Sequence, residues 1–312
     1  MRPLSPAEPF RRYSTWLRER YGGKTYRVSV DAGFSCPGRE MGLPCAYCDA
    51  AGSRAPYLGD EHSIREQIER GVSFLTRRYA PDHLLLYFQA FSNTYAPVAR
   101  LREIYDYALD QASFAAMIVG TRPDCIDEER AALLAEYRDR GLDVWVELGL
   151  QSVNNATLEL IRRGHTVEEF DAATQLLAGQ GINVAAHVIL GLPGEDADDA
   201  IAVAKHLSSL PVSGVKFHNL VVVEGTRLYR QYRKGELEPP GPARYEELLL
   251  AALEHLREDI VVMRLTCDPP RGRAHAPERL PDKAALFDGI TVRFQERGTR
   301  QGIYWSDNAD QG

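Results

Sequence analysis

Three of the five cysteines lie within one short segment, and thiolates grouped in this way are ligands for iron or zinc. Cys36, Cys45 and Cys48 are separated by eight residues and then by two, and the glycines and prolines around them predict a loop. Three thiolates can bind three irons of a [4Fe–4S] cubane and leave the fourth iron open to a small molecule. A zinc site completed by Asp49 or His62, or simple packing of the thiols, is the alternative on spacing alone.

Cys125 and Cys267 are distant from this segment in the sequence. Two cysteines cannot hold a second four-iron cluster by full thiolate ligation, so we expect both to be buried free thiols. A redox or radical-quenching role for Cys125 is the alternative.

The loop must be positioned by the elements around it, and strand and helix patterns alternate from about residue 26 to residue 234. The expected strands are short and mostly apolar, at residues 25–30, 84–88, 115–120, 143–148, 183–190 and 214–219. This alternation predicts an α/β fold with a parallel sheet. Because six units are too few for a closed barrel of eight, we expect a partial (β/α)6 barrel that is open and curved. Chemistry in such folds lies at the carboxyl ends of the strands.

The pattern changes at both ends of this core. Residues 1–24 are expected to form an N-terminal cap, residues 25–235 the core, and residues 236–312 a small C-terminal α/β extension. The extension begins at a proline-rich turn and is expected to hold a short strand at 261–266 between two helices.

The composition is that of a globular protein, with 44% hydrophobic and 26% charged residues. A net charge of -7 argues against a broad, nonspecific nucleic-acid surface. No apolar signal segment follows Met1, and no run of about eighteen apolar residues occurs, so we expect a cytoplasmic protein with no membrane partner.

A basic segment near the C-terminus is a candidate for contact with the phosphate of a nucleotide or RNA substrate. It consists of Arg271, Arg273, His275, Arg279 and Lys283. A solvated surface segment is the alternative.

Lys216 and His218 share one face of the sixth expected strand, because side chains alternate with a period of two. If that face lines the barrel interior, the two side chains are candidate catalytic residues, for substrate contact or proton transfer. Outward-facing, solvated side chains are the alternative.

Several further stretches lie in the expected strands or at their ends. They are VSVDAGFSCP (28–37), YFQAFSNTY (87–95), TRPD (121–124), ELGLQS (147–152), RGHT (163–166) and GLPGE (191–195). Together with Tyr47 just before the last cysteine of the loop, they resemble the radical S-adenosylmethionine (radical SAM) superfamily over residues 13–300. That family usually spaces its cysteines by three residues and then two. The longer first gap is similar to the branch that contains the Elongator catalytic subunit, and still more similar to its YhcC-like proteins.

The resemblance implies a [4Fe–4S] cluster on Cys36, Cys45 and Cys48 whose open iron binds S-adenosylmethionine (SAM). It implies a one-electron donor such as flavodoxin or ferredoxin, cleavage of SAM to a 5′-deoxyadenosyl radical, and hydrogen abstraction from a substrate. An RNA, a peptide and a small metabolite all remain open as that substrate. A second hypothesis is an iron–sulfur or zinc-binding regulatory module without radical catalysis. The segments that resemble an adenosyl pocket weigh against it.

The resemblance also assigns residues to the SAM pocket, with Tyr47 among them. The family's Gly-Gly-Glu after the second strand is replaced here by QAFSN (89–93), so Gln89, Asn93 or backbone carbonyls are expected to accept hydrogen bonds from the SAM ammonium group. A polar loop without a ligand is the alternative. Glu147 is expected to close the fourth strand and bind the ribose hydroxyls, with an ion pair to an arginine as the alternative.

The remaining pocket residues follow the fourth and fifth strands. Gln151 and Ser152 resemble the family's cofactor-facing turn. Arg163 is expected to clamp the SAM carboxylate, with a cation at a helix C-terminus as the alternative. Gly191 and Leu192 are expected to let the backbone approach the adenine, with a plain strand-to-helix turn as the alternative.

Overall fold

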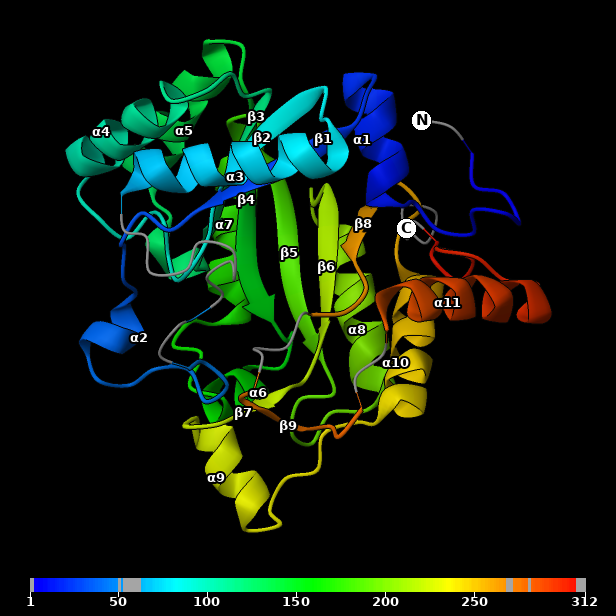
Figure 1. Ribbon diagram of the computed structural model, residues 1–312. Coiled ribbons are helices and arrows are strands. Elements are labelled where there is room, and N and C mark those ends of the chain that lie inside the picture. The colour runs from blue at the N-terminus through cyan, green and yellow to red at the C-terminus, as the bar shows by residue number, and fades with distance from the viewer. Residues whose placement is uncertain (1–2, 50–51, 53–62, 268–271, 280–281, 307–312) are drawn as a thin grey trace, which may run out of the picture.

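A computed structural model describes residues 3–49, 52, 63–267, 272–279 and 282–306. A seven-stranded parallel sheet forms its centre and curls into an open half-barrel (Figure 1). Its order is β1 (Thr25–Val30), β2 (His83–Phe88), β3 (Ala116–Thr121), β4 (Asp143–Gln151), β5 (Asn183–Leu190), β6 (Gly214–Asn219) and β8 (Val261–Arg264). The predicted α/β partial barrel is confirmed, and the seventh strand comes from the segment predicted as the C-terminal extension.

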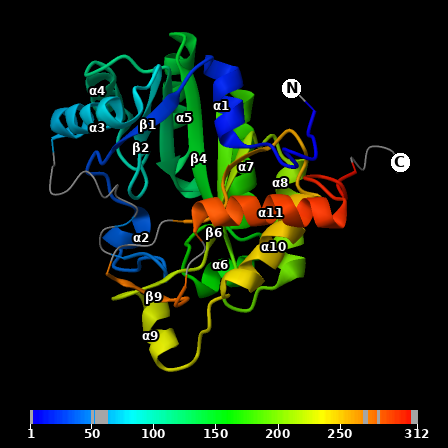
Figure 2. The ribbon, with the colours of Figure 1, turned by 45° about the vertical axis from the view of Figure 1, so that its right-hand side comes forward.

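Helices cover the outer face of this sheet (Figure 1, Figure 2). They are α3 (Ile64–Tyr79), α4 (Val98–Leu109), α5 (Glu128–Asp139), α7 (Val167–Gly179), α8 (Ala197–Ser209) and α10 (Pro242–His255). Every second strand residue, such as Val28, Val146 and Val215, joins one continuous apolar core with them. In the described part of the chain, no helix is long and apolar enough to span a membrane.

Helix α1 (Tyr13–Tyr21) lies against the inner face of the sheet. Its Trp16 packs edge-on against Trp145 of β4, with 5.2 Å between the ring centroids. Leu17 joins the same apolar cluster, which includes Ile118 of β3. Figure 1 shows α1 at the amino ends of the strands, so it covers the inner face at that end.

The two chain ends pack together beside α10. Helix α11 (Lys283–Arg297) contributes Phe287 and Phe294, whose rings lie 5.7 Å and 6.3 Å from the ring of Phe10. The side-chain oxygen Oε1 of Gln301 accepts a hydrogen bond from the backbone N–H of Arg11 (2.8 Å). The N-terminal segment is therefore fixed by residues that follow the barrel in the sequence.

Short elements gather at the carboxyl ends of the strands, at the bottom of Figure 1. They are α2 (Pro37–Glu40), α6 (Asn155–Leu160), α9 (Arg227–Arg233) and a two-stranded antiparallel sheet of β7 (Val222–Val223) and β9 (Ala274–Ala276). A second apolar cluster joins them, and it includes Ala46, Leu158, Leu228 and Ala276. Neither α2 nor the small sheet was predicted from the sequence.

Candidate active site

The cysteine loop follows β1 directly and lies at the carboxyl edge of the sheet (Figure 1). Cys36 and Cys45 are buried and Cys48 is half-buried. Both Cys36 and Cys45 act electrostatically on the Cys48 thiol, so the three side chains form one group. Within the described residues, no three His, Cys, Asp or Glu side chains are close enough together to hold a single metal ion. His62, the alternative zinc ligand, lies outside the described residues.

Contacts with α6, α9 and β9 hold this loop in place. The N–H of Ala46 donates to the Ile161 carbonyl (2.8 Å), and the Ala46 carbonyl accepts from the N–H of Leu228 (3.0 Å). Asp49 Oδ2 lies 2.8 Å from Arg273 Nη2. One member of the predicted basic segment is therefore in an ion pair at the end of the cysteine loop.

Two guanidinium groups lie against cysteine sulfurs. Arg39 Nη2 is 3.2 Å from Cys48 Sγ, and Arg163 Nη1 is 3.6 Å from Cys45 Sγ. Arg39 also stacks over the ring of Phe91, 4.2 Å from its centroid. Burial raises the pKa of the Cys48 thiol, and the Arg39 guanidinium opposes that rise. Cations in these positions stabilise thiolates, the form in which cysteine binds metals.

Gly149 of β4 makes room for Arg163. A Cβ at position 149 would lie 2.3 Å from Arg163 Nη2. The Gly149 carbonyl accepts from Arg163 Nε (3.1 Å) and Nη2 (2.7 Å), and it lies 2.9 Å from His165 Nε2. Burial and the Arg163 charge lower the pKa of His165 to about 4. The SAM-carboxylate contact of Arg163 stays a prediction, because two of its nitrogens already bind this carbonyl.

The turn after β2 has an unusual backbone. Ala90 and Phe91 have φ angles of 75° and 59°, in a region that favours glycine. Other residues with such angles cluster at functional sites. Asn93 holds the turn, since its Nδ2 donates to the carbonyls of Ala90 (3.0 Å) and Gly120 (2.9 Å). Its Oδ1 is buried without a partner among the described residues, and such an acceptor suits a cationic ligand group. Gln89 is half-buried at the start of the turn.

Glu147 lies in the middle of β4 rather than at its end. The expectation that it closes the strand is wrong, because β4 continues for four more residues and keeps pairing with β5. Its Oε2 accepts hydrogen bonds from Tyr87 (2.6 Å), His187 (2.8 Å) and Lys216, and its Oε1 lies 3.4 Å from Arg27 Nη1. The ion pair with an arginine is therefore present, and ribose binding by Glu147 stays a prediction.

Lys216 and His218 both lie on the inner face of β6. Lys216 is 1% exposed and reaches Glu147. The His218 ring stacks on His187 of β5, with 5.3 Å between centroids. His218 Nε2 is buried and has no hydrogen-bond partner in the part of the chain that the structure describes. The prediction that Lys216 and His218 share one face of the strand is confirmed, and their catalytic roles stay predictions.

We call these inner-face side chains the inner charged layer. Its members are Arg27 of β1, Tyr87 of β2, Glu147 of β4, His187 of β5, and Lys216 and His218 of β6. Sequence reasoning missed Arg27, Tyr87 and His187. The period of two that indicated Lys216 and His218 was the available signal.

The turns after β4 and β5 are joined by a hydrogen bond between Ser152 Oγ and the Glu195 carboxylate. Burial raises the pKa of Glu195 to about 6. Gln151 is buried and has a φ of 76°, next to an irregularity in the β4–β5 pairing. The structure thus brings these two predicted SAM-binding turns together.

Gly191 and Leu192 pack against the segment that leads to α10. Gly191 has a φ of 81°, and a Cβ there would lie 2.3 Å from Pro240 Cγ. Leu192 is 2% exposed in the second apolar cluster. One side of this turn is therefore occupied by protein, and the adenine contact stays a prediction.

Tyr47 of the loop and the two cysteines outside it differ in their surroundings. Burial raises the pKa of Tyr47, which lies beside Cys45, well above the usual range of a phenol, so this side chain stays protonated. Cys125 is a buried free thiol, as predicted, and burial raises its pKa to about 12. Cys267 is half-buried instead, with its sulfur 3.2 Å from Asn219 Oδ1.

The other members of the basic segment that the structure describes are exposed. His275 is exposed and lies 3.5 Å from Glu224 Oε2. Arg279 is exposed, and Lys283 begins α11. Arg271 lies outside the described residues.

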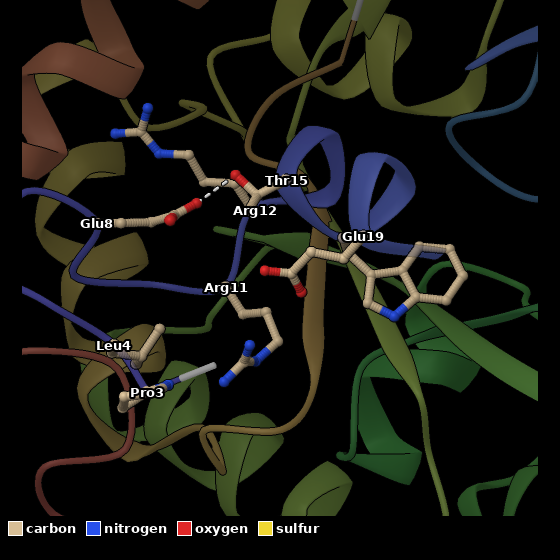
Figure 3. A pocket seen from close by; sticks show the side chains of 8 residues that line it. Pro3, Leu4, Glu8, Arg11, Arg12, Thr15 and Glu19 are labelled. Carbon is tan, nitrogen blue, oxygen red and sulfur yellow. Dashed lines mark hydrogen bonds between the residues drawn. The ribbon is translucent and has the colours of Figure 1, made fainter. Parts of the chain in front are cut away.

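A small pocket shown in Figure 3 lies elsewhere, between the N-terminal segment and α1. It is lined by Pro3, Leu4, Glu8, Arg11, Arg12, Thr15, Trp16 and Glu19. Because α1 lies at the amino ends of the strands, this pocket is separate from the cysteine loop at their carboxyl ends (Figure 1).

Family models agree with this geometry. A model of the radical SAM superfamily matches residues 33–207, which hold the cysteine loop and the strands β2 to β5. The chain belongs to the radical SAM superfamily. A model of the radical SAM C-terminal domain matches residues 212–294.

Relatives of this radical SAM chain match it along most of its length. YtqA of Bacillus subtilis is 34% identical over 310 residues, which cover 97% of this chain and 95% of the relative. YhcC of Escherichia coli K12 is 34% identical over 264 residues, 84% of each chain. The predicted resemblance to the YhcC-like branch is confirmed.

A solved structure shares the fold. The archaeal Methanocaldococcus infernus Elp3 superposes with a TM-score of 0.67 at 22% sequence identity. The match covers 89% of this chain and 64% of that protein, so the chain spans somewhat less than two thirds of it. This likeness supports the half-barrel fold.

Membership of the radical SAM superfamily implies an enzyme that uses a [4Fe–4S] cluster and SAM. The residues present fit both groups. Cys36, Cys45 and Cys48 offer three thiols at the carboxyl edge, and guanidinium groups lie against two of them. The unpartnered Oδ1 of Asn93 lies in the turn that follows β2 at the same edge.

Proposed function

We propose that this chain holds a [4Fe–4S] cluster on Cys36, Cys45 and Cys48, cleaves SAM reductively, and abstracts hydrogen from an RNA, a peptide or a small metabolite. The three-thiol loop at the carboxyl edge, with a guanidinium on two of its sulfurs, carries this proposal. When bound, the reduced cluster supplies the electron that splits SAM into methionine and a 5′-deoxyadenosyl radical. A flavodoxin- or ferredoxin-like protein of the cytoplasm would supply that electron.

Arg39 and Arg163 would set the electrostatics of the thiolates. Each places a positive charge and an N–H donor beside one sulfur. Hydrogen bonds to sulfur and local charge both tune the reduction potential of a cluster. The protonated Tyr47 hydroxyl would add a neutral donor beside Cys45.

The SAM molecule would lie across the turns at the carboxyl edge. Asn93 Oδ1, with Gln89 and the backbone of the turn, would accept the ammonium hydrogens. The joined turns at Gln151–Ser152 and Gly191–Leu192 would hold the adenosyl group. Because these turns are fixed by buried contacts, such a pocket would be largely formed before SAM binds.

The test is anaerobic reconstitution of the purified protein with iron and sulfide, followed by dithionite and SAM. We expect 5′-deoxyadenosine, and we expect the Cys45→Ala variant to lose both the cluster and this product. Cys125→Ala, a buried thiol outside the loop, is the matched control and should keep both. Full iron content in Cys45→Ala would overturn the ligand assignment.

A fully loaded protein that forms no 5′-deoxyadenosine would point to the other class of function. The measurement is repeated with a desalted and an undesalted cell extract as sources of substrate. If neither triggers SAM cleavage, the regulatory module without radical catalysis becomes the better hypothesis.

A further inference from the structure

The inner charged layer has a single carboxylate among its six members, that of Glu147. Its aromatic neighbours add no negative charge. The guanidinium carbon of Arg27 lies 4.7 Å from the ring centroid of Tyr13 and 5.2 Å from that of Tyr87. Burial raises the pKa of both phenols, so both stay neutral.

Basic groups outnumber the single carboxylate in this layer. Burial and then the charges of Arg27 and Arg264 lower the pKa of Lys216 well below its usual range. Burial and Lys216 lower the pKa of His187 to about 4, and burial, His187 and Arg264 lower the pKa of His218. These bases hinder one another's protonation even though Glu147 is present. A bound anion would offset this mutual repulsion and favour the protonated, charged forms of these bases.

The exposed part of the layer consists of basic side chains. The side chains of Glu147 and Lys216 are 0% and 2% exposed, whereas those of His187 and Arg27 are 21% and 18% exposed. His218 is half-buried, and its Nε2 has no partner among the described residues. A molecule inside the half-barrel would therefore meet imidazole and guanidinium groups, and the carboxylate lies behind them.

We propose that Arg27, His187 and His218 form a binding site for an anionic group, a carboxylate or a phosphate, of the enzyme's substrate. This inference rests on the proposed function, and it narrows the substrate class. Charge-assisted hydrogen bonds to such a group are strong when they are shielded from water. Glu147 is a positioning residue, since it holds His187 in the site and Lys216 behind it, and Tyr87 in turn donates a hydrogen bond to Glu147.

The location suits a substrate anchor. His218 is two residues nearer the carboxyl end of β6 than Lys216, and it pairs in register with Ile189 of β5. A ligand whose anion lies on His218 and His187 would extend toward the carboxyl edge, where the cysteine loop lies. Its reacting carbon would then lie nearer that edge than its anchored end.

The predicted SAM pocket lies at a different depth. Apart from Glu147, residues predicted for that pocket, such as Asn93 and Ser152, belong to the turns that follow the strands, whereas Glu147 lies four residues before the end of β4. The anion and SAM should therefore be able to bind at the same time. Simultaneous binding distinguishes a substrate site from an additional contact to the SAM molecule.

The test uses the reconstituted, unreduced holoenzyme and ligand-observed NMR. The probes are inorganic phosphate, acetate and, as the neutral analogue, acetamide. We expect at least one anion to bind, with no binding of acetamide, and the anion preferred distinguishes a phosphorylated from a carboxylated substrate. His218→Gln and Arg27→Gln should weaken anion binding at least tenfold. His206→Gln on the outer helix α8 is the matched control and should bind as the wild type does.

His218→Gln keeps the test decisive if Arg27→Gln fails to fold, because His218 Nε2 has no partner to lose in the described chain. Anion binding that is unchanged in His218→Gln, equal to that of acetamide, or displaced by SAM would overturn the proposal. The variant that lacks all three loop cysteines separates the two proposals. Anion binding that survives in it, together with failed SAM cleavage by the loaded wild type, would reject only the proposed function.

Discussion

The guanidinium Nη1 of Arg163 lies 3.6 Å from the sulfur of Cys45. Its other two nitrogens bind the carbonyl of Gly149, so the side chain joins the cysteine loop to β4. Arg163 is 6% exposed. Burial lowers the pKa of its guanidinium, but its neighbours, Tyr47 and Cys45 first, raise that pKa by more, so the side chain stays charged. A fixed, buried cation beside one cysteine is therefore part of this site before any ligand binds.

Removing this cation should lower the reduction potential of the cluster. Arg163→Gln loses a positive charge and an N–H donor at the sulfur, and both favour the reduced state. We expect a fall of about 40 mV, equivalent to roughly 1 kcal/mol for a one-electron couple. Arg163→Lys keeps the charge, so its reduction potential should lie between those of the wild type and Arg163→Gln. Potentiometric titration followed by EPR measures the shift, and an unchanged potential at full iron content would contradict the assignment.

Gly149→Ala should have the same effect without changing any charge. The added Cβ would lie 2.3 Å from Arg163 Nη2, so the guanidinium has to move away from the carbonyl and the sulfur. The double variant with Arg163→Gln should show no further shift, because both changes remove one contact. Gly179→Ala, where nothing lies within 4 Å of the new Cβ, is the control. Additive shifts in the double variant would disprove the link.

Glu147→Gln should destabilise the fold strongly. The change leaves the buried Lys216 and the partly buried Arg27 without a carboxylate, and breaking the buried Lys216 ion pair in this way costs about 3–5 kcal/mol. Urea unfolding of the holoenzyme measures this loss in the free energy of unfolding. Glu136→Gln removes a partner of Arg102 at the exposed surface and should change the unfolding free energy little. Similar midpoints for the two variants would show that the layer is not electrostatically coupled.

Local rules explain which parts of this site the sequence could predict. The period of two placed Lys216 and His218 on one face, and the same rule applies to Arg27, Tyr87 and His187. Their convergence on Glu147 depends on register between strands, such as His187 opposite Lys216, and register is set by tertiary pairing. A single sequence carries no direct signal for that pairing.

The end of β4 and the small sheet show where local patterns fail. In the sequence, Gly149 suggests the end of a strand, yet it lies inside β4. A glycine occupies this position because a Cβ there would collide with Arg163. β7 and β9 are two and three residues long and pair across about fifty residues of chain. Such short segments show no measurable periodicity, so only the folded chain reveals them.

Stability should fall as the pH is lowered from 7 to 5, partly through His187. Its pKa is about 4 in the folded protein and about 6.5 in the unfolded chain. Between these values the unfolded chain takes up a proton that the folded protein does not, so acid favours unfolding. Between pH 7 and pH 5, His187 should lower the free energy of unfolding by roughly 2 kcal/mol. Denaturant unfolding at several pH values should show a smaller loss in His187→Gln than in the wild type, with His206→Gln as control. Equal losses in all three would contradict the lowered pKa.

Gly191→Ala and Gly194→Ala separate backbone strain from steric contact in the turn after β5. Both glycines have similar φ angles, 81° and 85°, so each alanine should cost about 1–2 kcal/mol from the left-handed backbone. The Cβ at 191 would also lie 2.3 Å from Pro240 Cγ, whereas nothing lies within 4 Å at 194. Overpacking should therefore make Gly191→Ala costlier by about 1–3 kcal/mol in urea unfolding. Equal costs would mean that Pro240 does not press on the turn, and that this side of Gly191 is open to an adenine after all.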